Sequence, residues 1–571
     1  MIEPGRSGHY QPGPPGSLSA RPSFTISSGY GSIIAATAAE AANRHLNTIL
    51  AALGERRCRL AGDRMRSSIC SVCALLALMS AATQAQAKVY KVGPAETIKA
   101  PTTQLMSRLK PGDVVEIAGG QTYGPFAIKA KGKKDRPITI RGVKIDGKRP
   151  LITSKGGFTV HVDHGEHVIV EGLEITGGDY CFRHHGAWVV LRDTVIHHCK
   201  NGLLGTDYES GSLTMEYCEV HHCGHGDQHH QIYMSTNGKQ FPRSVFRMQH
   251  CYIHDAIGGN SVKSRAERNE IYFNWIEGAR YHELELIGPD VDPWDPRGKH
   301  PPREDSDVVG NVLRSTRKSA WATIRVGGDG TGGTAGRYRF VNNTIIVPPT
   351  MSGAVFRHFM MLESIEMHSN VLFAHGGRVR VALQQGFDQQ GDEKKADQYI
   401  WSTGKQEIAG SNNWISMGMR DVPKQWQNTR SGKDPGFKDL ARHDLTPKDG
   451  SPLLDAGQPK TFGPKGYAFP DGLPQPTFLP PRRKLLAPGS AKARPKRGKG
   501  LDIGAYEGQG TPGKGEKVNP AATASSGSAS GGAGFRVAGF RLRKRHLAIA
   551  GAGGLAFLVL IVVLITRRKR R

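Results

Sequence analysis

The chain has 571 residues with a formal net charge of +27, and 72 of its residues are glycine. A hydrophobic content of 38% is that of a folded protein and excludes a wholly disordered chain. Residues 482–571 hold 20 Lys and Arg against 3 Asp and Glu, and residues 1–64 add +3, which leaves only +7 for the large middle part. Most of the net positive charge therefore lies near the two ends of the chain, where it favours contact with anionic lipid. We expect no nucleic-acid partner.

The beginning of the chain has the pattern of a secretory leader. Arg66 precedes an apolar run over residues 69–79, and Ala85-Gln86-Ala87 forms a small-residue cleavage site before Lys88. This order is typical of a signal peptide, so we expect the protein to be exported. The preceding residues carry no sustained pattern and are interpreted as a non-native or disordered extension.

The end of the chain has the pattern of a membrane anchor. Residues 547–566 contain no charge and are long enough to cross a bilayer core of about 30 Å. Basic clusters at 541–545 and 567–571 flank this run, and the second suits a stop-transfer signal on the cytoplasmic side. The Ser/Gly/Ala-rich residues 521–534 before it are predicted to be a flexible linker. A surface-sorting tail that is later processed remains the alternative.

These patterns, with the repeat described next, divide the chain into eight segments and predict a single-pass anchored protein on the periplasmic or cell-surface face of a bacterial membrane. The predicted segments are an extension (1–64), a signal peptide (65–87), an N-terminal cap (88–150), the repeat (151–430), a closing region (431–508), a linker (509–546), a transmembrane helix (547–566) and a basic cytoplasmic tail (567–571).

A repeat begins near Val168. Its core is an apolar residue, two variable residues, a small residue or Asn, one variable residue and a second apolar residue, with shortest spacings of 21 to 24 residues. The second apolar residues are Ile175, Ile196, Val220, Ile253, Ile276, Leu313, Ile345, Leu372 and Ile415. Because the apolar residues lack helical spacing, a period of this size predicts coils of short strands that stack into a parallel β-helix.

The small residue of the repeat becomes asparagine in its later coils. The residues concerned are Asn274, Asn311, Asn343, Asn370 and Asn413. Asparagines that hold one position over five coils predict a ladder of side-chain amides at a turn that tolerates left-handed backbone.

After Gln384 the coils become irregular. Asp434-Pro-Gly-Phe437, Ser451-Pro-Leu-Leu-Asp-Ala-Gly457 and Leu501-Asp-Ile-Gly-Ala-Tyr-Glu507 resemble the closing segments of right-handed parallel β-helix proteins of the pectin-lyase type. This resemblance covers residues 90–507 and implies the handedness, which the chirality of parallel crossovers also favours. The predicted fold class is an all-β, right-handed parallel β-helix (a solenoid) between the signal peptide and the transmembrane helix.

Aligned coils bring ionisable side chains into columns, because neighbouring strands lie about 4.8 Å apart. One column, called the Lys263 column below, contains Tyr233, Lys263, Glu285 and Arg325. The column beside it contains Gln231, Ser261, Glu283 and Thr323, with His230 and His282 at its edge. Lys263, Arg265, Glu283 and Glu285 are predicted to share one exposed face.

The reaction that suits these groups is β-elimination from a uronic-acid glycan, which needs a base, a group that neutralises the carboxylate and a proton donor. Lys263 beside Arg265 is the predicted base. Arg325 or Arg265 is predicted to bind the carboxylate, and Tyr233 or His230 to give the proton.

Four residues in or beside the two columns are predicted to contact an acidic sugar. They are His230, His282, Glu283 and Glu285. The alternative is a structural ladder of stacked ion pairs on a solvated face, formed by Lys263, Glu285 and Arg325.

A narrower resemblance concerns one coil. Ser261-Val-Lys-Ser264, followed by Arg268-Asn-Glu-Ile-Tyr-Phe-Asn-Trp-Ile276, is similar to the catalytic coil of the chondroitinase-B and alginate-lyase family of β-helix enzymes. The resemblance implies that Lys263 is the base. Glu285 stands where that family has an arginine on the next coil.

The same family carries acidic calcium ligands just before the lysine, and here that stretch holds Ala256 and Gly258. The metal is therefore left unknown. Calcium has no support from this stretch, although Glu283 and Glu285 offer oxygen ligands one coil later.

Histidines and cysteines also recur at equivalent positions. His197/His198, His221/His222 and His254 lie on three coils, which indicates either a transition-metal site or, with more weight, a turn ladder. Cys218/Cys251 and Cys199/Cys223 stack on neighbouring coils, which allows disulfides or a ladder of buried thiols.

The leading hypothesis is an exported, membrane-tethered, monomeric β-helix that acts on acidic polysaccharide as a lyase. A non-catalytic protein that binds or organises surface glycan is the main alternative. A glycoside hydrolase or uronate epimerase on the same scaffold is the third.

Overall fold

The computed structural model of the chain describes residues 87–205, 209–288, 304–318, 321–328, 336–359, 362–387, 408–461, 472–513 and 516–517. The chain divides into two units, residues 1–86 and 87–571, and all described residues belong to the second. The predicted extension, transmembrane helix and basic tail lie outside the described residues, as do nearly all of the signal peptide and most of the linker. Within the described residues, no helix has the length and apolarity needed to cross a membrane.

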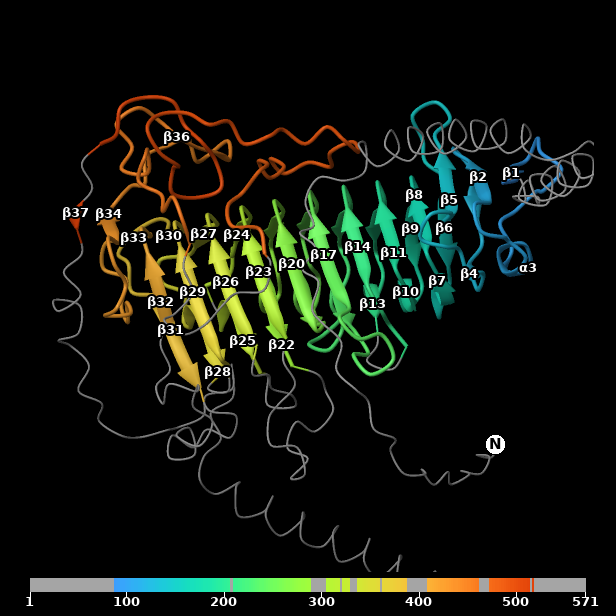
Figure 1. The fold of residues 1–571 in the computed structure, drawn as a ribbon, viewed down its shortest axis with the longest axis horizontal. Helices are drawn as coiled ribbons and strands as arrows, with labels where there is room; N and C mark the ends of the chain where they lie inside the picture. The colour runs from blue at the N-terminus through green and yellow to red at the C-terminus, as the bar shows by residue number, and fades with distance from the viewer. Residues whose placement is uncertain are drawn as a thin grey trace, which may run out of the picture. The chain divides into compact units, whose positions relative to one another are not determined.

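The described unit is built from three long sheets, here called A, B and C (Figure 1). Each complete coil gives one strand to each sheet in turn, whereas the first and last coils do not reach sheet C. Sheet A contains β1 (Val89–Val92), β2 (Val114–Ala118), β5 (Ile138–Val143), β8 (Val168–Glu171), β11 (Val189–Arg192), β14 (Leu213–Glu216), β17 (Val245–Gln249), β20 (Arg268–Tyr272), β23 (Asp305–Val309), β26 (Arg337–Val341), β29 (Ser364–His368) and β32 (Ile408–Ser411).

Sheet B contains β3 (Thr122–Tyr123), β6 (Leu151–Ser154), β9 (Glu174–Gly177), β12 (Val195–His197), β15 (Glu219–His221), β18 (Tyr252–His254), β21 (Trp275–Glu277), β24 (Val312–Arg314), β27 (Thr344–Val347), β30 (Val371–Ala374), β33 (Trp414–Ser416), β34 (Arg430–Gly432) and β37 (Glu516–Lys517). Sheet C contains β4 (Phe126–Ile128), β7 (Phe158–Glu166), β10 (Tyr180–Ala187), β13 (Asn201–Gly205), β16 (Ile232–Ser235), β19 (Val262–Arg265), β22 (Leu284–Ile287), β25 (Ala322–Gly327), β28 (Ala354–Phe359) and β31 (Ala382–Phe387).

Consecutive coils pair in parallel, which confirms the predicted parallel β-helix. The second apolar residue of each repeat lies in register with the next along sheet B, from Ile175 through Ile276 to Ile415. All nine are buried, together with the inward residues of the other two sheets. The sheets already begin at β1 and β2, so the coils start inside the segment predicted to be a cap.

The asparagine ladder forms as the sequence predicts. The Asn311 Nδ2 group donates to Asn343 Oδ1 at 3.0 Å and to the Ile271 carbonyl at 2.8 Å, and Asn311 Oδ1 accepts from the Asn274 main-chain N–H at 2.8 Å. The same pattern continues through Asn370 to Asn413. The left-handed residue is the one before each ladder position, for example Phe273 with φ of 56°. The ladder thus satisfies main-chain groups that a sharp turn leaves unpaired.

The first coil also holds the short helix α3 (Thr103–Ser107), which the sequence does not predict. Thr102 caps it by accepting the Leu105 N–H at 3.2 Å, and Met106 is buried against the first coils. The apolar Met106 therefore closes the N-terminal end of the core.

The closing region covers the outside of sheet B as well as ending the coils. It contains the antiparallel pair β35 (Phe437–Asp439) and β36 (Asp444–Pro447). Figure 1 shows it in orange and red along one side of the sheets. Phe437 and Tyr506 share one buried cluster with Tyr252 and Trp275, whose side chains point outward from sheet B. Arg483 forms an ion pair with Glu277 at 2.5 Å.

The cysteines pair differently from either bridge considered in the sequence. Cys181 and Cys199 form a disulfide between successive coils. Cys218, Cys223 and Cys251 are free and buried. Burial, followed by the neighbouring Cys218 thiol, raises the pKa of the Cys251 thiol well above its usual value. Cys218 and Cys251 therefore belong to the thiol ladder that the sequence offered as the alternative.

Replacing Asn311 by Ala should lower the free energy of unfolding by at least about 2 kcal/mol, because it removes buried hydrogen bonds to the Ile271 carbonyl and from the Asn274 N–H. Urea denaturation measures this change. Gln240→Ala removes an exposed amide and should alter stability by less than about 0.5 kcal/mol. Equal midpoints for the two variants would show that the ladder is not needed for stability.

Candidate functional site

The Lys263 column has the register that the repeat predicts. Tyr233 on β16 pairs with Lys263 on β19, Lys263 with Glu285 on β22, and Glu285 with Arg325 on β25. These four side chains thus follow one another across sheet C, one strand apart. Their inward neighbours Val262, Leu284 and Ile324 are buried in the core and fix the outward direction of the column.

Glu285 is the centre of the column's electrostatics. Its side chain is only 1% exposed and lies between two cations: Lys263 Nζ is 3.7 Å from one carboxylate oxygen, and Arg325 forms an ion pair with the other. Asn260 Nδ2 donates a further hydrogen bond to it. Lys263, at 12% exposure, also lies with its Nζ 5.0 Å from the centre of the Tyr233 ring. Lys263 is thereby held between a carboxylate and a phenol.

Arg265 has a different place from the one predicted. It is 2% exposed rather than on an open face. Its Nε donates to Tyr233 Oη at 2.9 Å, and its Nη1 donates to the Gly288 carbonyl. Arg265 therefore fixes the Tyr233 hydroxyl, and its burial leaves it poorly placed to bind a carboxylate of a substrate.

The two predicted histidines are buried and uncharged at neutral pH. His230 Nδ1 accepts the Asn260 N–H at 2.9 Å, which leaves the ring hydrogen on Nε2, and its ring meets Tyr233 edge-on at 5.5 Å. Burial, and then the charge of Lys263, lowers the pKa of His230 to about 3. His282 Nδ1 donates to the Ala322 carbonyl at 2.8 Å, and burial lowers its pKa to about 4.

Glu283 is also buried rather than exposed. The Ala279 N–H donates to its carboxyl oxygens at 3.2 and 3.0 Å, and Ser261 Oγ donates at 3.3 Å. Burial raises the pKa of Glu283 to about 8, so the group is mainly protonated at pH 7. A protonated Glu283 and a Glu285 held by Arg325 do not fit a calcium ion, and no cluster of three or more His, Cys, Asp and Glu suited to a metal occurs among the described residues.

Two residues that the sequence reasoning missed extend the column. Arg357 on β28 is in register with Arg325, and burial together with the charge of Arg325 lowers the pKa of Arg357 to about 10. Trp321, 56% exposed, lies just before β25 with its ring 5.6 Å from the Arg357 guanidinium and 6.1 Å from the Tyr281 ring. Arg357 could have been found from the alternating segment Ala354-Val-Phe-Arg357, which has the pattern of the other sheet C strands. The connection before this segment is irregular, so the repeat spacing did not align it with Arg325.

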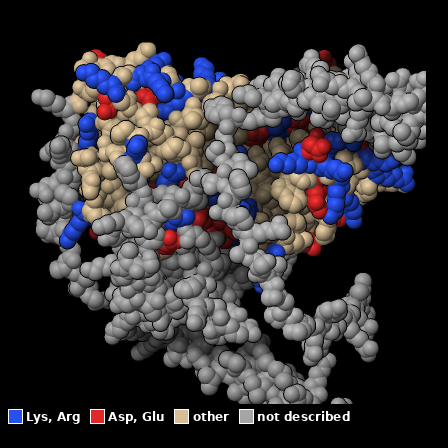
Figure 2. Space-filling view, viewed as in Figure 1, with Lys and Arg blue, Asp and Glu red and all other residues tan. Residues whose placement is uncertain are grey.

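Sheet A provides a structural comparison, because it carries a column with strictly alternating charge. In register on consecutive strands lie Glu116, Arg141, Glu171, Arg192 and Glu216. Arg141 Nε is 2.7 Å from Glu171, and Arg192 Nε is 2.6 Å from Glu216. On the face drawn in Figure 2, many Lys and Arg side chains likewise have Asp or Glu beside them. Alternation is what a stabilising ladder requires.

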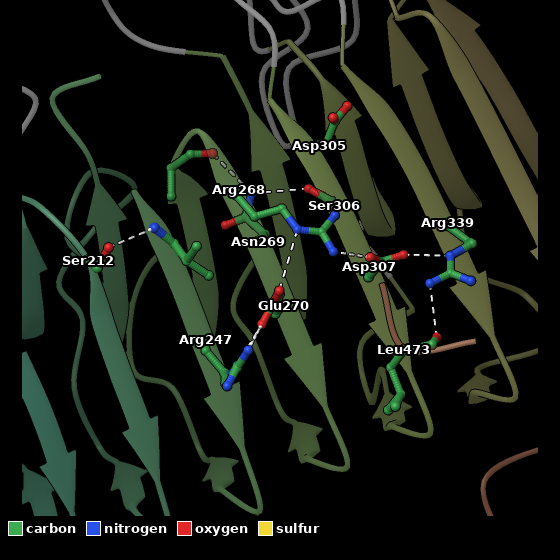
Figure 3. A network of polar contacts seen from close by, with 12 residues as sticks. Ser212, Arg247, Arg268, Asn269, Glu270, Asp305, Ser306, Asp307, Arg339 and Leu473 are labelled. Carbon is green, nitrogen blue, oxygen red and sulfur yellow. Dashed lines mark hydrogen bonds and ion pairs between the residues drawn. The ribbon is translucent and has the colours of Figure 1, made fainter. Parts of the chain in front are cut away.

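A second set on sheet A, shown in Figure 3, connects the strands to the closing region. Arg268 pairs with Asp307, and Arg339 Nε is 2.5 Å from the same carboxylate. Arg339 Nη2 donates to the Leu473 carbonyl at 2.9 Å. Asp307 is fully buried between the two guanidinium groups. This network is structural, since each of its charges has an opposite partner.

The Lys263 column ends in two like charges. Arg325 is followed by Arg357, so two guanidinium groups lie on adjacent strands. Like charges in register also occur on sheet A, where Glu270 is opposite Asp307 and both carboxylates contact Arg268. The distinctive feature of the Lys263 column is therefore that the like charges are two cations on the same outward side of sheet C as Lys263.

The recurring histidines form a stack where three strands of sheet B end, at β12, β15 and β18. His197, His221 and His254 follow one another with ring centroids 5.1 Å apart. Burial lowers the pKa of His221 to about 4, with His254 as the next cause. His254 instead bonds Glu219 and Asp255, at 3.1 and 2.7 Å. Stacked rings with ordinary partners agree with a turn ladder.

Comparison with known proteins gives few matches. No protein-family model matches the chain, and no curated protein is significantly similar to it. Among solved structures, pectate lyase Pel9A is similar over 75% of this chain and 98% of its own, with 12% identity and a TM-score of 0.43. The GH136 lacto-N-biosidase from Eubacterium ramulus matches over 61% of this chain and 67% of its own, with 13% identity and a TM-score of 0.30.

An alginate lyase from Paenibacillus sp. str. FPU-7 matches over 63% of this chain and 93% of its own, with 14% identity and a TM-score of 0.26. At such identities and TM-scores, these likenesses carry no argument about activity. The function is therefore argued from the chain's own residues.

Glu283 should make stability fall as pH rises from about 4.5 to about 8. Because its pKa in the folded chain lies above the ordinary glutamate value of 4.5, its contribution is fully present below pH 4.5 and is lost as pH rises through about 8. Glu283→Gln should therefore show a shallower loss of stability over this range, measured by urea midpoints at a series of pH values. Asp135→Asn, which removes an exposed carboxyl, is the control. Parallel curves for Glu283→Gln and the unsubstituted chain would exclude a buried neutral carboxyl.

Proposed function

We propose that this protein cleaves uronic-acid glycans by β-elimination, and that the Lys263 column with Arg357 is its active site. One observation carries the proposal: Tyr233, Lys263, Arg325 and Arg357 lie in one row on the outer side of sheet C. Tyr233 is the neighbour of Lys263, and its hydroxyl accepts a hydrogen bond from the buried Arg265. The set contains a base, a proton donor and two groups that can hold a carboxylate.

The two guanidinium groups would bind the carboxylate of the sugar. Bidentate arginine–carboxylate contacts fix orientation, and two neighbouring cations stabilise the negative charge that develops when the proton next to the carboxylate is removed. Burial, and after it the charge of Arg325, lowers the pKa of Arg357 to about 10. An anionic ligand between the two guanidinium groups would relieve the part that comes from their repulsion. Trp321 offers an exposed aromatic surface to the apolar face of a sugar ring.

Proton transfer in the proposed reaction is balanced. Lys263, which pairs with Glu285 as an ammonium, must first lose one proton to water. The neutral amine then takes the proton from the carbon next to the carboxylate, and the electron pair forms a carbon–carbon double bond as the glycosidic carbon–oxygen bond breaks. Tyr233 gives its phenolic proton to the leaving oxygen. Arg265, 2.9 Å away, stabilises the phenolate that results. Transfer of the proton from Lys263 to the phenolate restores both groups.

Hydrolysis is less well supported than elimination. A hydrolase needs two carboxyl groups on either side of the scissile bond. Of the two glutamates here, Glu283 is buried against Ala279, and Glu285 lies between Lys263 and Arg325.

The proposal predicts that the full-length chain, incubated with polygalacturonate, alginate and chondroitin, produces the ultraviolet absorbance of unsaturated sugar ends on at least one of them. Lys263→Ala should lower kcat on that glycan by at least about 100-fold, because the base is removed. Lys155→Ala, an exposed lysine between β6 and β7, is the matched control and should keep full activity.

Unchanged turnover of Lys263→Ala would remove Lys263 from the reaction. Retained binding of a glycan without any absorbance would favour the non-catalytic binding protein. New reducing ends without absorbance would favour a hydrolase.

Arg357→Gln should lower kcat/KM for the cleaved glycan by at least about tenfold, because the carboxylate loses one of its two cationic partners. Steady-state kinetics measure this change, and Arg497→Gln, an exposed arginine of the closing region, is the control. A kcat/KM equal to that of the control would show that Arg357 does not contact the substrate.

A further inference from the structure

A cavity of about 910 Å³ lies near the C-terminal end of the coils. It is lined by the loop at residues 375–380, the turn at 417–420 and the end of β34. Its volume is in the range of small-molecule sites. The loop leads into β31, which is four strands away from β19 in sheet C and hence about 19 Å along the stack. The cavity is therefore distant from Lys263. Although β31 adjoins β28, which carries Arg357, neither Arg325 nor Arg357 lines the cavity.

The charged side chains that line this cavity have one sign. They are Arg378, Arg380, Arg420 and Lys433, and among the described residues no Asp or Glu lines the cavity. Arg420 Nε donates to the Arg380 carbonyl at 3.1 Å, which holds its guanidinium at the rim. Cations gathered without a carboxylate create a positive potential that favours an anionic ligand. Sheet A, by contrast, sets an acid beside each arginine of its ladder.

The main chain adds hydrogen-bond donors to the same wall. Gly376, Gly377 and Gly418 have φ values of 91°, 75° and 89°, a backbone region that favours glycine. Their N–H groups donate to no residue in the described part of the chain. A Cβ added to Gly376 or Gly377 would meet no atom within 4 Å, so packing does not require glycine there. Main-chain donors beside cations are a recurrent way of holding oxyanions.

The cavity also has an apolar part. Phe373, Val379 and Met417 line it, and Met417 is exposed. An inorganic anion would use only the cations and N–H groups. A sugar acid would use both parts, because its carboxylate is anionic and one face of its ring is apolar.

We propose that this cavity is a second binding site, which takes the carboxylate-bearing end of an acidic oligosaccharide. The choice of a uronate rests on the proposed function, whereas the anionic character of the ligand rests on the cavity alone. The row of residues that begins with the Lys263 column continues in register through Arg325 and Arg357 to Gln385 on β31, the strand that follows the cavity loop. A glycan lying across the strands of sheet C would extend from the column toward this cavity.

The test measures binding without turnover. The full-length Lys263→Ala chain is titrated calorimetrically with trigalacturonate, with trimannuronate and with inorganic sulfate. Adding Arg378→Ala and Arg420→Ala should weaken binding of a trisaccharide by at least about tenfold, because two charge-assisted contacts are lost. Arg108→Ala with Arg497→Ala removes the same charge from exposed arginines elsewhere and should leave binding unchanged. Circular dichroism and urea midpoints check that each variant folds.

Equal trisaccharide affinity in the two double variants would overturn the proposal, and so would sulfate binding at the cavity with no trisaccharide binding. The result is separable from the lyase activity. If no glycan is cleaved but trisaccharide binding still depends on Arg378 and Arg420, the cavity proposal stands and the lyase proposal fails. If cleavage depends on Lys263 but the Arg378→Ala, Arg420→Ala variant binds the trisaccharide unchanged, the lyase proposal stands and the cavity proposal fails.

Discussion

Main-chain hydrogen bonds between consecutive coils hold every strand in register with the next, and this constraint governs the rest of the molecule. Any side chain meets the residue at the same position one coil later, about 4.8 Å away. Inside, the constraint is satisfied by apolar columns such as Ile175 to Ile415 and by the asparagine ladder. Outside, neighbouring charges either alternate in sign, as from Glu116 to Glu216 on sheet A, or share an oppositely charged side chain, as Glu270 and Asp307 share Arg268. On sheet C the same constraint places the guanidinium groups of Arg325 and Arg357 on adjacent strands.

The repeat in the sequence was sufficient to predict the coils and the Lys263 column. The apolar anchors Val262, Leu284 and Ile324 recur on neighbouring coils, so the residues after them had to align. Burial could not be predicted in the same way. Periodicity tells which side of a strand a residue faces, but Glu283 is buried by the connection at Ala279, and such irregular connections carry no repeat.

Three other features depended on long-range contacts that a local pattern does not carry. Arg265 turned from an exposed clamp into the support of Tyr233 because its side chain reaches across one strand. Cys199 bonded Cys181 rather than a cysteine of the following coil. The closing region was expected at the end of the coils, and its contacts with Tyr252 and Trp275 became visible only in the structure.

The closing region also has a consequence for the order of folding. A solenoid of independent coils can form progressively from the N-terminus as the chain is made. Here the outer side of sheet B remains apolar around Tyr252 and Trp275 until residues 437–506 arrive to cover it. Arg483 reaches Glu277 across 206 positions of sequence, and Asn342 donates to the Asp502 carbonyl. The middle coils are therefore completed by a region synthesised after all of them, and chains truncated before this region would expose an aromatic surface prone to aggregation.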